Sequence, residues 1–170
     1  MDGSENFYRD WNYYRDGFGD LEREFWFGNT NIQRLTSQGH YDLRVDLEAF
    51  NGSTVYAQYS DFSLASERDY FQLNVGAYSG NSGNGLGYHN GHNFTTYDRD
   101  YNPANSRCVK TSLGGWWYHD CHASNLNGLY LTDNPIRNSS GISWSPWLGV
   151  HYSLKRTVMK IRPTPKIITR

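Results

Sequence analysis

Side chains that could bind a hard cation are concentrated in one short stretch of this 170-residue chain. Asp98, Asp100 and Asn102 alternate along an expected loop. Alternating side-chain oxygens, completed by main-chain carbonyls, suit Ca²⁺, which takes about six to eight oxygen ligands in a flexible geometry. An EF-hand is excluded, because no Gly and no closing Glu stand at the required positions. A solvated acidic loop explains the same residues equally well, since Arg99 between the aspartates reduces the local negative potential.

Cys108 and Cys121, the only two cysteines, bracket a turn rich in glycine and aromatic residues just after this loop. Their spacing allows one disulfide, and closing so short a loop contributes about 3 kcal/mol in the chain-entropy model. Inside the turn, Trp116 and Trp117 are adjacent. Neighbouring side chains on a strand point to opposite faces, so we expect one tryptophan to pack inside and the other to cover the loop.

Three Asn-X-Ser/Thr sequons suggest a compartment as well as a modification. The acceptors are Asn51, Asn93 and Asn138. Together with the cysteine pair, they favour an oxidising, extracellular setting and secretion. Two free thiols in a reducing compartment are the alternative.

Other chemical constellations are weaker. His119, Asp120 and His122 are too crowded for a zinc site, and no further ligand cluster stands near them in the sequence. Ser139 and His151 are present, but nothing in the spacing places a nucleophile beside an oriented base. We therefore do not expect an enzyme.

Composition narrows the possible partners. The net charge of −1 gives no strong attraction to nucleic acid or to anionic membranes. No run of about 18 apolar residues exists, so no membrane span is expected. Hydrophobic residues make up only 37% of the chain, whereas 14 Tyr, 6 Trp and 8 Phe supply large rings for a core or a binding surface.

Two helices and a hairpin are expected in the first third of the chain. Residues 20–28 read as a short helix from an Asp cap to a Gly stop, and residues 29–39 as a second. Strict alternation over 41–48 predicts a half-buried strand. Asn51-Gly52 is a turn signal, so strands 41–50 and 53–61 should pair in antiparallel fashion.

The rest of the chain contains fewer regular elements. A third strand is expected over residues 70–77, followed by a glycine-rich loop over 76–91 that lacks a phosphate-binding spacing. Residues 92–156 show only fragments of regular structure, and loops of this length are usually functional or disordered. A final strand over 159–163 should return to the sheet, ahead of a frayed tail over 164–170.

Several motifs together resemble one known family, the fibrinogen-like domain of ficolins, tachylectins, angiopoietins and tenascins. The matching positions are Trp116 to Tyr130, Trp144, Trp147, Tyr152 to Lys155 and Met159 to Pro163, with Asp16 to Gly19 and Glu24 to Asn29 upstream. The resemblance spans roughly residues 5–163. It implies an α+β domain with a twisted antiparallel sheet, short flanking helices and a long loop-rich C-terminal subdomain that carries a Ca²⁺ site and a binding pocket. Residues 1–170 would form a single domain without the family's N-terminal part.

The resemblance also implies a set of calcium ligands. In the family, two ligand side chains lie eight and six residues before the first cysteine of the C-terminal pair, which are Asp100 and Asn102 here. Main-chain carbonyls at Ala104 and Ser106 would complete the set, with Asp98 as nearby support. Family members commonly have Asp where this chain has Asn102, so we expect one weak site, roughly 10⁻⁴–10⁻³ M.

A binding pocket is implied at the second cysteine. In lectin-like members the peptide bond before that cysteine is cis, here Asp120–Cys121, and it aims the N–H groups of Cys121 and His122 at the acetyl oxygen of N-acetylated sugars. His122 matches the pocket histidine. Two aromatic walls are missing, because the usual tyrosines fall on Ser112 and Asn138.

Two functions follow from the resemblance. The first is a secreted, Ca²⁺-dependent lectin domain of innate immunity that binds microbial carbohydrates or acetylated groups. The alternative is a protein-interaction module of the angiopoietin or tenascin type, which the missing tyrosines favour. Under either hypothesis the full-length protein is expected to form a homo-oligomer.

Overall fold

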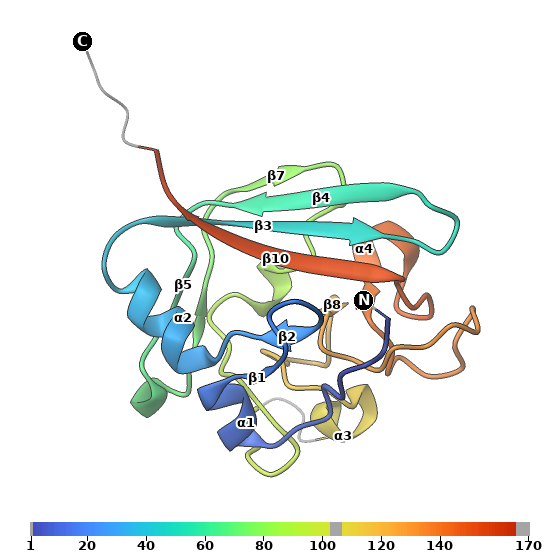
Figure 1. Ribbon diagram of the computed structural model, residues 1–170, viewed down its shortest axis with the longest axis horizontal. Coiled ribbons are helices and arrows are strands. Elements are labelled where there is room, and N and C mark those ends of the chain that lie inside the picture. Colours follow the sequence, from blue (N-terminus) through green and yellow to red (C-terminus); the bar gives the residue numbers. More distant parts are fainter. Residues whose placement is uncertain (1, 103–106, 166–170) are drawn as a thin grey trace.

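A computed structural model describes residues 2–102 and 107–165, and Figure 1 shows its arrangement. The helices are α1 (Trp11–Asp16), α2 (Asn29–Thr36), α3 (Cys108–Ser112) and α4 (Ser145–Leu148), with short 3₁₀ turns at Glu67–Asp69 and Gly87–His89. The strands are β1 (Phe18–Gly19), β2 (Phe25–Trp26), β3 (Tyr41–Glu48), β4 (Thr54–Tyr59), β5 (Ser63–Leu64), β6 (Leu73–Asn74), β7 (Tyr78–Gly80), β8 (Ser124–Asn125), β9 (Ser143–Trp144) and β10 (Arg156–Pro163).

A four-stranded antiparallel sheet, in the order β10-β3-β4-β7, crosses the top of the molecule in Figure 1. Alternation in the sequence explains its two faces. Leu43, Val45 and Leu47 of β3 are buried on the inner face, while Arg44 is exposed on the outer one. The predicted hairpin is confirmed, since β3 and β4 pair from Leu43–Tyr59 to Glu48–Thr54.

The C-terminal strand returns to this sheet, as predicted, and is longer than expected. All eight residues of β10 pair with β3, from Arg156 opposite Glu48 to Pro163 opposite Tyr41. The sheet therefore joins segments more than 100 residues apart in the sequence.

The helix predicted for residues 20–28 is wrong; the second helix is confirmed as α2. Residues 20–24 form a turn, in which Asp20 N donates to Glu24 O at 2.9 Å, and β1 pairs with β2 on either side of it. Gly19 and Gly28 have φ values of +89° and +97°, a region that glycine adopts without strain, and they flank this hairpin turn and its second strand. The burial of Trp26 between exposed Phe25 and Phe27 is the period-2 signal of a strand.

The third predicted strand is only partly correct. Phe71, Leu73 and Val75 all face the core, as expected. Positive φ angles at Tyr70 and Phe71 restrict the strand, however, so that β6 covers only Leu73–Asn74 and pairs with β5. The fourth strand of the main sheet is instead β7, farther along the chain.

Aromatic side chains fill the core below the sheet. One group joins Trp11 and Tyr14 of α1 to Trp26, Phe94 and Trp117, with ring centroids 5.1–6.4 Å apart. These rings compensate for the low aliphatic content of the chain. Helix α1 was not predicted.

The second half of the chain has little regular structure, as the sequence indicated. Between α3 and β10 it contains only two-residue strands, the short helix α4 and turns. The fold is α+β, with one main antiparallel sheet, short helices and a loop-rich C-terminal half. None of the helices in the described ranges reaches the length and apolar character needed to cross a membrane.

Candidate functional site

A disulfide closes the turn that the sequence singled out. Cys108, the first residue of α3, is bonded to Cys121, with their Cα atoms 4.9 Å apart. Cys121 and His122 are both half-buried, and Asp120 is exposed. The turn Asp120–Cys121–His122 thus lies at the surface and is covalently attached to α3.

The expected cis peptide bond at Asp120–Cys121 is not observed. In residues 2–102 and 107–165 the cis peptide bond is Asn134–Pro135. His119 N donates to Cys121 O at 3.0 Å, so a tight hydrogen-bonded turn forms around the trans bond. A trans bond is the lower-energy form, by about 3 kcal/mol for a residue other than proline.

Both tryptophans before the turn are buried, which corrects the expectation that one would pack inside and the other would cover the loop. Trp116 and Trp117 each have 0% exposure. Both side chains are buried because the segment crosses the interior and has packing partners on both sides. Trp117 Nε1 donates to Phe71 O at 2.8 Å, while the Trp116 ring contacts that of His89 with centroids 6.3 Å apart.

His89 forms hydrogen bonds to the main chain on both sides of the turn. Its Nδ1 lies 2.8 Å from Trp117 O, and its Nε2 accepts from Ala123 N at 3.2 Å and from Ser124 N at 3.1 Å. These partners require a neutral ring with the proton on Nδ1. Burial lowers the pKa of His89 to about 3, so the ring stays neutral at physiological pH. Sequence reasoning missed this residue, which lies in the glycine-rich loop expected over 76–91.

In the acidic loop, Asp100 contacts the main chain of Asn102. Asp100 Oδ1 accepts from Asn102 N at 3.0 Å, and Asn102 is buried beside the exposed Asp100. Asp98 has a structural task, because its Oδ1 accepts from Trp11 N at 3.0 Å and from Thr96 Oγ1 at 2.7 Å. It thereby attaches the start of α1 to the loop.

A carboxylate and an amide oxygen at Asp100 and Asn102 fit the hard-oxygen chemistry of Ca²⁺. The expected carbonyl ligands at Ala104 and Ser106 lie outside the described residues. Within the described ranges, one group of three potential metal ligands exists, Cys108, Asp120 and Cys121. Its two sulfurs form the disulfide and carry no thiolate charge, so this group is not a metal site.

One hydrogen bond connects the acidic loop to the turn. Asn102 Nδ2 donates to His119 O at 2.6 Å. His119 is the residue whose N–H closes the turn on Cys121. A change in the position of Asn102 would therefore be transmitted to the turn through this hydrogen bond.

The remaining predicted pocket residues are only partly assembled. His122 Nε2 lies 2.9 Å from Ser139 O, which places the segment containing Asn138 beside the turn. Burial lowers the pKa of His122. Asn138 is exposed and accepts from Ser140 Oγ at 2.6 Å. Ser112 has 0% exposure, so its side chain offers no surface to a ligand.

Aromatic rings do lie near the turn, on a side that the sequence did not indicate. His119 stacks on His92 with centroids 4.1 Å apart and an angle of 15° between planes. Tyr88, 41% exposed, lies 5.4 Å from His119, and its hydroxyl donates to Asp120 O at 2.9 Å. The rings of Tyr88 and His92 come from the loop over 87–92, outside the segment that the cysteines bracket.

The three sequon asparagines differ in exposure. Asn51 and Asn138 are exposed, and Asn51 Oδ1 accepts from Ser53 N in the β3–β4 turn. Asn93 is half-buried, and its Nδ2, the atom that a glycan would modify, lies 3.4 Å from Tyr101 O. Glycosylation remains a prediction for all three, and exposure favours Asn51 and Asn138.

Comparison with known proteins agrees with this architecture. A family model for the C-terminal globular domain of fibrinogen beta and gamma chains matches residues 1–164. Techylectin-5A of Tachypleus tridentatus is 48% identical over 160 residues, which are 94% of this chain and 55% of the relative. Human ficolin-3 is 45% identical over 163 residues, 95% of this chain and 54% of the relative. The chain thus spans about half the length of these two relatives.

Solved structures show the same fold. The fibrinogen-like globe domain of human ANGPTL2 matches with a TM-score of 0.93 and 43% identity over 97% of this chain and 77% of that one. The corresponding domain of human ANGPTL6 matches with a TM-score of 0.95 and 39% identity, over 98% and 76%. The chain therefore belongs to the family of fibrinogen C-terminal globular domains.

Proposed function

We propose that this chain is the extracellular recognition domain of a Ca²⁺-dependent lectin and acts without catalysis. Its ligands would be carbohydrates or acetylated groups on microbial surfaces. The observation that carries the proposal is the hydrogen bond from Asn102 Nδ2 to His119 O, which joins the calcium loop to the turn at Cys121. The similarity to techylectin-5A and ficolin-3 supports the lectin class.

In this account Asp100 and Asn102 hold Ca²⁺ together with main-chain carbonyls of Ala104 and Ser106. The ion would supply a fixed positive charge that orders the loop, and Asn102 would then hold His119 in place. The disulfide and His89 fix the other ends of the same turn. Main-chain donors at Cys121 and His122 would bind an acetyl oxygen, because a preordered turn loses little entropy on binding.

Surrounding rings could contribute where the expected tyrosines are absent. Tyr88 and His119 present an aromatic surface beside Asp120. Such rings suit the apolar face of a sugar, since they offer contact area at low conformational cost.

Glycan arrays with and without a chelator test the proposal. We expect Ca²⁺-dependent binding to N-acetylated sugars, and its loss in Asp100→Ala, with Asp133→Ala as an exposed carboxylate control in another loop. Calorimetry on the same variants measures Ca²⁺ binding separately from sugar binding, because Asp100→Ala should abolish the heat of Ca²⁺ binding. Equal Ca²⁺ heats in wild type and Asp100→Ala would end the metal assignment, and an array without any sugar signal would end the lectin assignment.

A protein-interaction module is the second candidate. The trans bond at Asp120–Cys121, the buried Ser112 and the polar Asn138 all depart from the pocket expected for an acetyl-binding lectin. The match to the ANGPTL2 and ANGPTL6 domains agrees with this alternative. Capture of a protein receptor that N-acetylglucosamine does not displace would favour it.

A further inference from the structure

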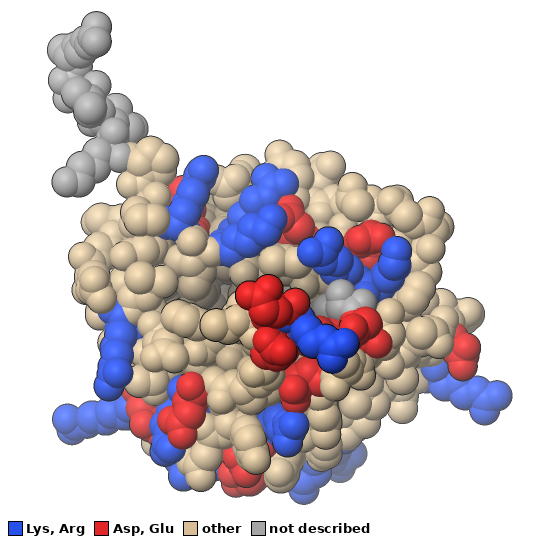
Figure 2. All heavy atoms as spheres, in the orientation of Figure 1, with Lys and Arg blue, Asp and Glu red and all other residues tan. Residues whose placement is uncertain are grey.

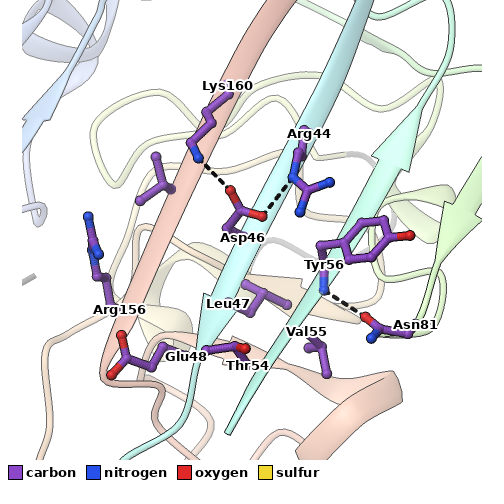
Figure 3. Close-up of a pocket in the computed structure, with 11 residues that line it drawn as sticks. Arg44, Asp46, Leu47, Glu48, Thr54, Val55, Tyr56, Asn81, Arg156 and Lys160 are labelled. Carbon is purple, nitrogen blue, oxygen red and sulfur yellow. Dashed lines mark hydrogen bonds and ion pairs between the residues drawn. The ribbon is translucent and has the colours of Figure 1, made fainter. Parts of the chain in front are cut away.

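A hollow of about 360 Å³ lies on the outer face of the main sheet, the face turned away from the aromatic core (Figure 3). Side chains of β3, β4 and β10 line it, together with Asn81 from the loop after β7. Alternation in the strands sends polar residues to this face, and Val158, which is paired with Asp46, is an apolar residue among them. Leu47 and Val55 border the hollow from the core side of the sheet. The proposed function uses none of these residues.

The hollow carries excess positive charge. Its charged lining consists of Arg44, Arg156 and Lys160 against Asp46 and Glu48. Figure 2 shows Lys and Arg side chains interleaved with Asp and Glu in the upper part of the molecule, over β10 and β3. The hollow therefore has one more cation than it has anions.

Among the charged side chains that line the hollow, Arg156 is the one without an ion pair. Asp46 is shared by Arg44 at 2.8 Å and Lys160 at 2.7 Å. Glu48 is paired at 2.8 Å with Lys155, the residue just before β10. Within residues 2–102 and 107–165, the Arg156 guanidinium has no hydrogen bond and no ion pair within 4.0 Å, and Figure 3 shows it extended beside Glu48 without a contact line. Its charge acts on Glu48 only as a secondary cause, after Lys155, of the lowered pKa of that carboxyl.

Further polar groups line the same hollow. The Arg44 guanidinium lies over the Tyr56 ring, 4.2 Å from its centroid, which holds both side chains in place. Asn81 Oδ1 accepts from Tyr56 N at 2.8 Å, so its Nδ2 remains as a donor at the rim. Strand β3 is paired on both sides, and no backbone group in the middle of the hollow can add a strand from a peptide.

We propose that this hollow binds anionic polysaccharides, whose sulfate or carboxylate group would be held by Arg156. A guanidinium has a planar fork of donors that matches the geometry of an oxyanion. The open, polar hollow suits a hydroxyl-rich chain better than an apolar ligand, and Lys160 and Asn81 offer donors to neighbouring sugar oxygens. The site is independent of the turn at Cys121 and would bind without Ca²⁺.

Binding of dextran sulfate, with unsulfated dextran of equal length as the reference, tests the proposal. Polygalacturonate replaces sulfate by carboxylate and distinguishes the two oxyanions. We expect Arg156→Gln to weaken binding of the preferred polymer about 5- to 10-fold and to lower the salt dependence by about one charge. Arg34→Gln, the same change on the exposed side of α2, should leave binding unchanged.

Excess N-acetylglucosamine and chelator should not displace the anionic polymer, so failure of the lectin assignment leaves this experiment intact. An equal loss in Arg156→Gln and Arg34→Gln would overturn the site, because it would show attraction to net charge alone. Poly-glutamate binding as tightly as either polysaccharide, with the same dependence on Arg156, would overturn the ligand class in favour of acidic peptides.

Discussion

At the scale of single residues, His89 and Asn102 determine how the turn at Cys121 is held. Each contacts the turn through a hydrogen bond at 3.2 Å or less, from a separate loop. Neither contact was predictable from the sequence, because a histidine in a glycine-rich loop and an asparagine in an acidic loop have many ordinary roles. The acidic loop and the cysteine pair were predictable, since their residue types and short spacings are visible in the sequence.

His89 should make the domain sensitive to acid. Its pKa in the folded protein, about 3, lies below the usual value of 6.5, so the unfolded chain binds more protons between these two pH values. The free energy of unfolding therefore falls as pH drops below about 6.5, by about 2 kcal/mol at pH 5 from this group alone. Denaturant unfolding across this range measures the effect. His151→Gln, an exposed control, should show the same fall, and a stability that stays flat or rises would contradict the assignment.

Asn102→Asp should separate the two tasks of this side chain. The substitution would add an anionic ligand to the proposed Ca²⁺ site, but it removes the donor to His119 O. Without Ca²⁺ we expect a loss of about 1–3 kcal/mol in the free energy of unfolding, because the carbonyl then faces a carboxylate. With Ca²⁺ the variant should gain more stability than the wild type does. Thermal unfolding with and without Ca²⁺ measures both, and an unchanged response to Ca²⁺ would remove Asn102 from the ligand set.

At the scale of elements, sequence periodicity predicted the strands and the helix whose signals lie in neighbouring residues. Strands β3, β4 and β10 follow from alternation and turn signals, and α2 from its glycine boundaries. The helix predicted for residues 20–28 was wrong because a cap residue, charged residues and a glycine stop also occur in a turn between two short strands. The partner of β6 could not be foreseen, since pairing depends on positive φ angles at Tyr70 and Phe71.

Adjacent residues of β10 provide a matched test of its two faces. Ile161 is half-buried against the core, while Lys160 is exposed on the outer face. Ile161→Asn should lower the free energy of unfolding by about 2 kcal/mol, because it places an amide against apolar surface. Lys160→Asn should cost about 0.5 kcal/mol, the usual range for a surface ion pair. Urea titration of both variants decides, and equal losses would contradict the observed register.

The disulfide should matter most for the turn. A loop of this length contributes about 3 kcal/mol in the chain-entropy model. Replacing Cys108 and Cys121 together by Ser should lower the unfolding free energy by about that amount while the main sheet persists. Amide hydrogen exchange should then speed up in residues 119–123 before it does in β3. Uniform acceleration through the chain would show that the disulfide supports the whole fold and not the turn.

At the scale of the whole molecule, the fold and the family could be predicted from motifs, but the binding chemistry could not. The WWY–CH turn and the C-terminal strand identify the family because they recur at fixed spacing. The trans bond at Asp120–Cys121, the buried Ser112 and the rings of Tyr88 and His119 depend on contacts between loops distant in sequence. Such contacts leave no periodic pattern, so function has to be argued from the assembled site.

The weak affinity expected for the proposed sugar site determines how binding should be measured. A dissociation constant near 1 mM corresponds to only about 4 kcal/mol, so monovalent sugars must be titrated at millimolar concentration. Clustering of several domains in a longer protein would raise the apparent affinity without new contacts.

The most direct test follows the amide resonances of Cys121 and His122 while N-acetylglucosamine is added to the Ca²⁺-loaded domain. We expect saturable shifts at these two amides at millimolar sugar, and their disappearance when a chelator removes Ca²⁺. Amides of β3 should not move in either condition. Unmoved Cys121 and His122 amides at saturating Ca²⁺, or identical shifts with the chelator present, would contradict the claim that a calcium-ordered turn is the binding site.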